Sequence, residues 1–129
     1  MTFTVLMLVY RNPNMTPNQF KDHYENKHIP LMKSLAGKSF PISHTRRYIQ
    51  RAGADQQYAA TVLGGSQADF EYDCVSELKF ETEDGFKAMS TLLASPELSP
   101  QVGEDCAEFM DPGRTKVVVL GETNESLRD

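Results

Sequence analysis

Residues 16–31 read TPNQFKDHYENKHIPL, and the stretch opens with three agreeing signals for the start of a helix. Thr16 suits the N-cap position and Pro17 suits the first helical position. Gln19 can reach back to the backbone of Thr16 and complete a capping box. The sequence therefore predicts a helix that begins at residue 17, directly after a turn-rich segment.

Pro30 disturbs this helix, because proline removes a backbone donor and crowds the preceding turn. We therefore expect a kink or a rewound turn near His28, before Gly37 ends the helix. At about 100° per residue, four side chains share the stripe that faces the core: Tyr24, His28, Leu31 and Leu35. His23 falls to one side of that stripe, so the pattern directs His28 inward.

On either side of this helix, runs of β-branched and apolar residues predict strands. The four predicted strands cover residues 2–10, 43–51, 70–80 and 116–120. A second helix is expected from a cap at Thr82 to about Ala94. The segment after it is interrupted by Pro96 and Pro100, and a short helix is then expected over residues 102–110. The order β-α-β-β-α-β predicts an α+β, ferredoxin-like fold with an antiparallel four-stranded sheet and both helices on one face.

The other face of this sheet is left uncovered, so its apolar residues need a covering partner. Two such sheets packing face to face around a shared interior are the economical solution, which predicts a homodimer. Residues 52–70 form a long connection, and we expect a lid or a rim there. The domain is expected to span residues 1–121, followed by a polar C-terminal tail of residues 122–129.

Composition and charge argue against several classes of protein. The chain has 129 residues, which suits one domain with its own core, and a formal net charge of −5, which argues against a nucleic-acid partner. No apolar run approaches the roughly 18 residues that cross a bilayer, so no membrane span is expected. Cys74 and Cys106 lack metal-type spacing, and without a visible secretory signal we expect both to be reduced, in the cytoplasm.

Residues with useful chemistry gather in two short segments, which hold all three histidines of the chain: His23, His28 and His44. Imidazoles exchange protons near neutral pH. Arg46, on the same strand face as His44 and Tyr48, stays positively charged there. Together these groups suit proton transfer on an acidic aromatic substrate. Arg47 points to the opposite face and is expected at the surface or at an interface.

Each candidate also has a purely structural interpretation. His28 is either a general acid in an apolar cavity or a buried histidine bonded to a free carbonyl. His44 is either a second proton-transfer group or the partner in a strand-end hydrogen bond. Asp73 either tunes a histidine or pairs with an arginine. Tyr24 and Tyr48 either donate to substrate oxygens or pack in the core.

A metal site is not expected from this pattern. His23 and His28 lie five residues apart, which is about 140° on a regular α-helix, and no cysteine or carboxylate completes a convincing ligand set. Glu104 and Asp105 belong to the late helix, where a cap or a salt bridge is the expected role. The alternative for these two residues is a place at the mouth of a cavity.

Several spaced segments match one known pattern: Tyr10-Arg11, Met15-Thr16-Pro17, residues 20–31, residues 44–48, Tyr72-Asp73, and Glu104-Asp105 with Phe109. Through them the chain resembles the EthD-domain proteins of the dimeric α+β barrel superfamily, from residue 1 to about residue 121. The resemblance implies a ferredoxin-like subunit that pairs with a second copy into a barrel. It also agrees with the fold that the order of elements predicts.

Two further segments, residues 40–48 and 118–123, resemble the fungal polyketide branch of that family. That branch includes decarboxylases of atrochrysone carboxylic acid, so the resemblance implies a lyase that decarboxylates an anthraquinone-type polyketide acid without a cofactor or metal. The residues expected to be catalytic are His28, His44 and Asp73. The residues expected to bind the aromatic substrate are Arg46, Tyr48 and Tyr24.

Other functions stay open at this point. A dehydratase or cyclase acting on a related polyketide would use the same histidines without releasing CO2. A non-catalytic carrier would bind hydrophobic metabolites in the same barrel, with structural histidines. A cofactor-free oxygenase is a further possibility on this fold, and it predicts oxygen consumption. Family membership alone does not choose among these reactions.

Overall fold

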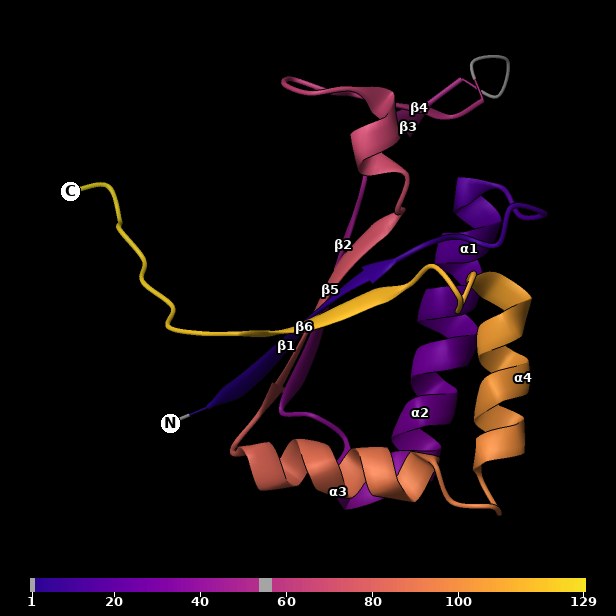
Figure 1. Ribbon diagram of the computed structural model, residues 1–129, viewed down its shortest axis with the longest axis vertical. Coiled ribbons are helices and arrows are strands. Elements are labelled where there is room, and N and C mark those ends of the chain that lie inside the picture. The colour runs from indigo at the N-terminus through magenta and orange to yellow at the C-terminus, as the bar shows by residue number, and fades with distance from the viewer. Residues whose placement is uncertain (1, 54–56) are drawn as a thin grey trace.

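The computed structural model describes residues 2–53 and 57–129 and contains an antiparallel sheet with helices packed on one face (Figure 1). The four strands are β1 (Phe3–Val9), β2 (Ser43–Tyr48), β5 (Cys74–Phe80) and β6 (Lys116–Leu120). Their order across the sheet is β2-β5-β1-β6, and each neighbouring pair is antiparallel. This topology confirms the predicted α+β, ferredoxin-like fold class.

The first helix, α1 (Pro17–His23), begins where the sequence predicts it. The Thr16 hydroxyl accepts a hydrogen bond from the Gln19 backbone at 3.1 Å, and the Gln19 side chain accepts one from the Thr16 backbone at 2.8 Å. Two backbone donors that the helix itself cannot satisfy thereby gain partners. The predicted capping box is confirmed.

The predicted disturbance of this helix is a π-helical turn. η1 (Tyr24–His28) joins α1 to α2 (Ile29–Ala36), and the N–H of Ile29 bonds the carbonyl of Tyr24, five residues back. Pro30 lies in the first turn of α2, where no backbone donor is required of it. The chain therefore passes the proline without a break. Gly37, at a φ of 53°, ends the helix as predicted.

This wider turn changes which histidines face the core. In a π-helical turn the hydrogen bond runs from residue i to residue i+5, so residues five apart lie on the same face. His23 and His28 have this spacing, and both are buried, with 9% and 7% of their surface exposed. The expectation that His23 lies beside the core stripe is therefore wrong, because it assumed a regular α-helix.

The connection between β2 and β5 contains more structure than a loop. β2 ends at Tyr48, earlier than predicted, and β3 (Arg51–Ala52) pairs with β4 (Ala59–Ala60) in a small hairpin. A 3-10 turn, η4 (Gln67–Phe70), comes after it, and β5 therefore starts at Cys74 rather than at residue 70. Residues 54–56 of this connection lie outside the described residues, and its role as a lid or rim stays a prediction.

Two helices come after β5. α3 (Glu83–Leu93) begins at its predicted cap, Thr82, whose hydroxyl accepts from the backbone of Gly85. α4 (Ser99–Phe109) starts earlier than the predicted residue 102, because Pro100 begins the helix instead of interrupting it. Among the described residues, no helix is both long and apolar enough to cross a membrane.

The core lies between the sheet and the helices and consists of two clusters. The cluster nearer α1 and α4 contains Val9, Phe20, Tyr24, Cys74, Phe109 and Met110. The cluster nearer α3 contains Val5, Ala36, Leu78, Phe80 and Met89. Figure 1 shows α4 running beside the α1-η1-α2 column, so side chains from both columns meet over the sheet. This junction holds the buried titratable groups.

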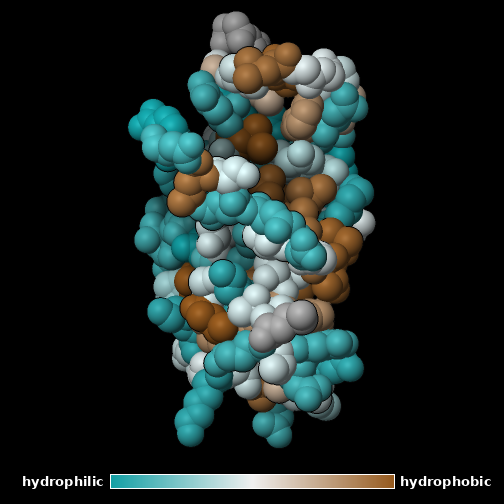
Figure 2. Space-filling view, turned by 90° about the vertical axis from the view of Figure 1, so that its left-hand side faces the viewer, coloured by the Kyte–Doolittle hydropathy of each residue, from teal (hydrophilic) through white to brown (hydrophobic). Residues whose placement is uncertain are grey.

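Within residues 2–53 and 57–129, no helix covers the opposite face of the sheet. Leu6 and Leu8 alternate along β1 with the buried Val5 and Val9, so they point to this face, and Val118 of β6 lies opposite Leu6. Figure 2 looks onto this side, where apolar patches lie among polar ones. From β6, residues 122–129 continue without helix or strand away from the helices (Figure 1).

Candidate functional site

The two histidines of the first helical column share one buried carboxylate. Nδ1 of His28 lies 2.6 Å from Oδ2 of Asp105, and Nε2 of His23 lies 2.9 Å from Oδ1. Asp105 comes from α4 and is 5% exposed. The ring of Phe109, one turn further along α4, stacks on His23 at 4.7 Å and contacts His28 at 4.8 Å between ring centroids. Packing and hydrogen bonds thus fix both imidazoles.

The protonation states within this cluster result from burial and hydrogen bonding. Burial raises the pKa of Asp105, but the hydrogen bonds from His28 and His23 outweigh it, so the pKa of the carboxyl lies below its usual value. Burial lowers the pKa of His28 below 6.5, although Asp105 opposes the shift. At neutral pH the pair is therefore a carboxylate and a neutral imidazole.

A neutral His28 beside a carboxylate has one favourable tautomer. Nδ1 must carry the proton, because Asp105 can only accept, and this leaves the lone pair on Nε2. Among residues 2–53 and 57–129, every fully buried side-chain nitrogen or oxygen has a hydrogen-bond partner. Nε2 of His28 makes no such bond there, so it retains contact with accessible space. The arrangement presents Nε2 as a base.

Tyr24 links His28 to the sheet. Its hydroxyl lies 2.8 Å from Oγ of Ser76 and 3.2 Å from Nε2 of His44, and its ring meets the His28 ring edge-on at 5.5 Å. Burial raises the pKa of the Tyr24 phenol, so it stays protonated. Burial, and then the charge of Arg46, lowers the pKa of His44 to about 4. The phenol thus lies between two imidazoles that are neutral at pH 7.

Arg46 faces inward from β2 and forms a fork on Glu25 of η1. Its Nε lies 2.6 Å from Oε2 of Glu25, and its Nη2 lies 2.9 Å from Oε1. Tyr48 also donates its hydroxyl proton to this carboxylate. The hydrogen bond from Arg46 is the largest cause of the lowered pKa of Glu25. Arg47 is exposed on the other face, 3.5 Å from Glu77, as the strand alternation predicts.

Asp73 pairs with arginines and not with a histidine. Its two oxygens lie 2.7 Å from Nε of Arg11 and 3.0 Å from Nε of Arg51. The guanidinium of Arg51 also donates to three carbonyls of the segment that follows it, those of Tyr58, Phe70 and Tyr72. Of the two roles considered for Asp73, the ion pair is the one that forms. The carboxylate beside His28 comes from Asp105.

Three members of this site are not among the residues that the sequence predicts to be catalytic or substrate-binding: His23, Glu25 and Asp105. The sequence gives Asp105 a salt bridge or a place at a cavity mouth, and the structure shows both. Asp105 is 77 positions from His28, so no local spacing connects the two. One signal was available for His23, because its five-residue spacing from His28 fits one π-helical turn, and Pro30 already predicts a rewound turn. Tyr24 and His28 lie on the inward stripe that the helical periodicity predicts. His44, Arg46 and Tyr48 share one strand face, as predicted, and the structure shows that this face is the inward one.

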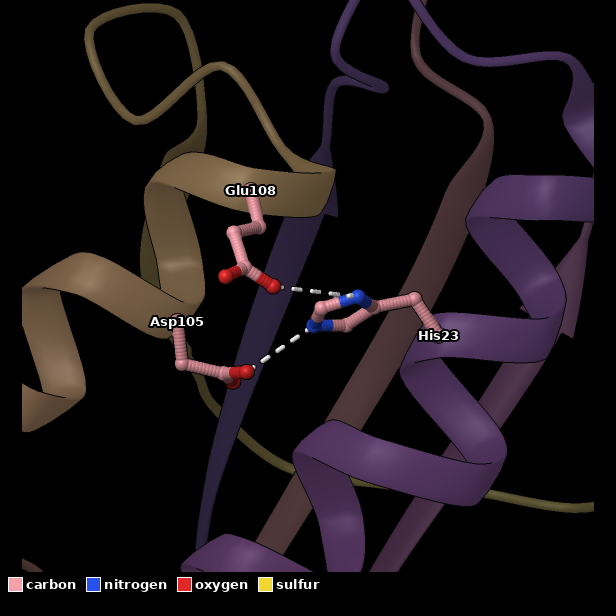
Figure 3. Close-up of side chains that lie close together, drawn as sticks. All are labelled: His23, Asp105 and Glu108. Atoms are coloured by element: carbon pink, nitrogen blue, oxygen red, sulfur yellow. Dashed lines mark hydrogen bonds and ion pairs between the residues drawn. The ribbon is translucent and has the colours of Figure 1, made fainter.

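One group of potential metal ligands lies close together among the described residues: His23, Asp105 and Glu108 (Figure 3). The two carboxylates face different nitrogens of the His23 ring. Asp105 lies at Nε2, and Oε2 of Glu108 lies 3.7 Å from Nδ1. Lys27 also pairs with Glu108, at 2.8 Å. The two ring nitrogens of an imidazole point in different directions, so one ion cannot be held by both carboxylates and the ring together. The arrangement suits hydrogen bonding better than metal binding.

Surface depressions approach the site from several directions, and one of about 660 Å³ reaches His23. One of about 450 Å³ lies between η1 and α4, where Asp105 and Leu31 line it. Another, of about 360 Å³, lies between Tyr48 and the segment of residues 60–64, and a smaller one of about 120 Å³ reaches Tyr48 from the side of Phe20. Tyr48 is therefore the site residue that both of these smaller depressions reach.

Comparison with known proteins identifies the family of the chain. The EthD domain, as a family model, matches residues 12–113. The chain belongs to the EthD domain family. Dehydratase ustZ from Ustilaginoidea virens is a distant relative, 26% identical over 88% of this chain and 78% of that protein. The resemblance to EthD-domain proteins is confirmed.

Solved structures of EthD-family and related proteins share the fold at low identity. An ethyl tert-butyl ether D (EthD) family protein from Bacillus halodurans C-125 has a TM-score of 0.57 and 16% identity, covering 95% of this chain and 100% of that one. An EthD-like protein from Ralstonia eutropha JMP134 has a TM-score of 0.56 and 13% identity, covering 92% and 87%. The likeness concerns the fold.

Proposed function

We propose that this EthD-family chain is a cofactor-independent lyase that removes water from a hydroxylated polycyclic polyketide acid, with His28 as the base. The Asp105–His28 hydrogen bond of 2.6 Å carries the proposal, because it leaves Nε2 of a neutral imidazole available. The relative named dehydratase ustZ supports the same type of reaction. The sequence favours decarboxylation, but a neutral imidazole is better suited to taking a proton than to supplying one.

In the proposed reaction, Nε2 of His28 takes a proton from the carbon next to a ketone of the substrate. The electron pair of that C–H bond first forms an enolate. The enolate then collapses to a carbon–carbon double bond as the C–O bond to the β-hydroxyl breaks. Tyr24 donates its phenolic proton to the departing hydroxide, which leaves as water. The proton on His28 and the Tyr24 phenolate then recombine, so that both groups are restored.

The remaining residues position these two groups and the substrate. Asp105 is a positioning residue, since it acts through His28 by selecting its tautomer. His44 and Ser76 hold the Tyr24 hydroxyl. Arg46 offers a guanidinium fork for the carboxylate of the acid. Asp73 has no part in this mechanism, because both of its oxygens are engaged by arginines.

Decarboxylation is the second candidate, and the resemblance of residues 40–48 and 118–123 to the fungal polyketide branch favours it. In that reaction the bond from the ring carbon to the carboxylate breaks and its electron pair forms an enolate. CO2 leaves as this bond breaks, and a proton then reaches the carbon. His28 would act in its protonated form, which the burial of this residue disfavours. The two candidates therefore demand opposite protonation states of the same imidazole.

Mass spectrometry of the product tests the proposal. We would incubate the purified protein with a β-hydroxy acid of the atrochrysone carboxylic acid class and expect a product lighter by one water. A product lighter by CO2 supports the second candidate, oxygen uptake supports an oxygenase, and bound but unchanged substrate supports a carrier. The His28→Gln variant should bind and fail to turn over, whereas Lys33→Gln, on the exposed side of α2, should match the unmodified protein.

We also propose that two copies pair through the uncovered face of the sheet and that the protein works in the cytoplasm. The apolar side chains of Leu6, Leu8 and Val118 on that face support pairing, because exposed apolar surface favours a covering partner. The free thiols of Cys74 and Cys106 fit a reducing compartment.

A further inference from the structure

The carboxylate of Glu25 is held as the carboxylate of a bound organic acid would be. Two nitrogens of Arg46 meet its two oxygens at 2.6 and 2.9 Å, and the hydroxyl of Tyr48 donates to one of them. A planar guanidinium recognises a carboxylate by such a fork, and a phenol adds a third donor. These contacts involve only the carboxylate group, so any carboxylate could make them.

We propose that Glu25 is an internal occupant of a carboxylate-binding site formed by Arg46 and Tyr48, and that an aromatic carboxylate ligand displaces it. The inference deepens the proposed function and rests on it for the acidic nature of the substrate. To the Arg46 fork already proposed for the acid group, it adds Tyr48 as a further donor and Glu25 as a residue of this chain that competes for the site.

Glu25 is placed so that it can leave. Its side chain is 31% exposed, while that of its partner Arg46 is 19% exposed, so a released glutamate carboxylate turns into water rather than into the core. Asp73 forms a comparable pair with Arg51, but these side chains are only 4% and 8% exposed. Breaking that second pair would strand buried charges, which is costly. Exposure therefore marks the Glu25 pair as the exchangeable one.

The surroundings of Tyr48 leave room for the body of an aromatic acid. The depression of about 360 Å³ beside Tyr48 is lined by apolar side chains that include Val62, Leu63 and Phe70. Leu63 is 99% exposed and free to cover a ligand there. A ring system resting in this depression would direct its acid group past Tyr48 toward Arg46.

The carboxylate-binding site also lies next to the groups that would move protons. Nη1 of Arg46 donates to the carbonyl of His44 at 2.7 Å, and its guanidinium carbon lies 5.9 Å from the centre of the Tyr24 ring. An acid held on this fork therefore has its neighbouring carbon atoms close to Tyr24 and His44. Glu25 occupies this place until the ligand arrives.

Competition by an internal group lowers the apparent affinity by the fraction of molecules in which the site is free. Removing the charge at position 25 should therefore strengthen the binding of carboxylates and leave uncharged analogues unaffected. We would measure Kd by calorimetry for naphthalene-2-carboxylate and naphthalene-2-carboxamide. The Glu25→Gln variant is expected to bind the carboxylate at least about tenfold more tightly than the unmodified protein, with no change for the carboxamide.

The matched control is Glu77→Gln. Glu77 also pairs with an arginine of β2, Arg47, but on the outer face of the sheet and at 3.5 Å, so its removal should leave both Kd values unchanged. The double variant Glu25→Gln/Arg46→Met should lose the gain in affinity. If Glu25→Gln does not fold, Glu25→Asp, which is too short to keep the fork, should show the same direction of change.

Equal, weaker or undetectable binding of the carboxylate by the folded Glu25→Gln variant would overturn the inference, as would a gain that survives loss of Arg46. The proposed function is tested separately by the turnover of His28→Gln. If carboxylates displace Glu25 but the protein does not turn over the substrate, only the proposed function fails. If the protein turns over the substrate but Glu25→Gln leaves the Kd unchanged, only the displacement of Glu25 fails.

Discussion

Asp105 is the residue on which the proposed chemistry of His28 depends. Replacing it with asparagine leaves a side chain that can offer Nδ1 either a donor or an acceptor, so the tautomer with a free Nε2 is no longer selected. Asp105→Asn is expected to lower kcat about 100-fold with little change in KM. Steady-state kinetics check this, with Glu104→Gln, the exposed neighbour on α4, as the control. A variant that changes only KM would contradict the positioning role.

The pH dependence of turnover distinguishes the two candidate reactions. Because burial holds the pKa of His28 below 6.5, a base mechanism predicts that kcat/KM falls as the pH drops through that pKa, with a midpoint under 6.5. Asp105 raises this pKa, so Asp105→Asn should move the midpoint to lower pH. An activity that instead falls as the pH rises would support His28 as an acid.

His44 makes the stability of the protein depend on pH. Its pKa is about 4 in the folded chain and has the ordinary histidine value of 6.5 in the unfolded chain. Between these two pH values, the unfolded chain therefore binds a proton that the folded chain does not. The free energy of unfolding should therefore decrease as the pH falls from 6.5 to 4, by about 3 kcal/mol from His44 alone. Urea unfolding across this window measures it. His44→Asn should flatten the slope, and an unchanged slope would contradict the prediction.

Sequence reasoning at the residue scale succeeds where faces are decided by local periodicity. Strand alternation correctly places Arg46 and Arg47 on opposite faces, because successive strand residues point to opposite sides, and the structure shows that Arg46 is the inward one. It does not find Asp105, because α4 is brought beside η1 by packing over the sheet and not by any sequence spacing. The catalytic and binding roles of His28, His44 and the other inward residues stay predictions.

At the scale of single elements, the start of α1 is the clearest link between sequence and stability. Thr16 and Gln19 cap each other's backbone groups, and losing the Thr16 hydroxyl leaves a backbone donor unsatisfied. Thr16→Ala is expected to lower the free energy of unfolding by about 1 kcal/mol. Urea unfolding checks this, with Thr123→Ala in the tail as the control. Equal stability of the two variants would contradict the prediction.

Signals that mark the ends of helices were more reliable than signals that mark the ends of strands. Thr82 and Gly37 bound helices as predicted, since both satisfy specific backbone groups. The start of β5 was misplaced because Phe70 is apolar and fits a strand pattern, although it ends a 3-10 turn that Ser66 and Asp69 cap. The sequence predicts that Pro100 interrupts the helix, but proline also suits a first helical turn, and α4 begins around it.

At the scale of the whole molecule, the uncovered face of the sheet predicts self-association. Leu6 of β1 and Val118 of β6 are cross-strand partners on that face. A lysine at either position would place a charge in a shared apolar interior, so Leu6→Lys and Val118→Lys are expected to shift the protein from a dimer to a monomer of 14.5 kDa. Light scattering after size exclusion measures the mass, with Leu127→Lys in the tail as the control. A monomeric unmodified protein would contradict pairing.

The order of elements along the chain was enough to predict the topology of the whole sheet. Connections between strands are short and un-knotted, so few arrangements of β-α-β-β-α-β are possible, and the observed order β2-β5-β1-β6 is one of them. The small β3–β4 hairpin was not foreseen, because each strand has only two residues and leaves no periodic pattern.

The aromatic side chains of the site have an optical consequence. The chain has five tyrosines and no tryptophan, and the rings of Tyr24 and Tyr48 lie 6.2 Å apart beside the groups assigned to catalysis. Ultraviolet fluorescence of the protein therefore originates from phenols alone, two of them at the place where a coloured polycyclic acid would arrive. If the proposed function holds, energy transfer to such a chromophore should quench that emission, and the protein would report its own occupancy without a dye.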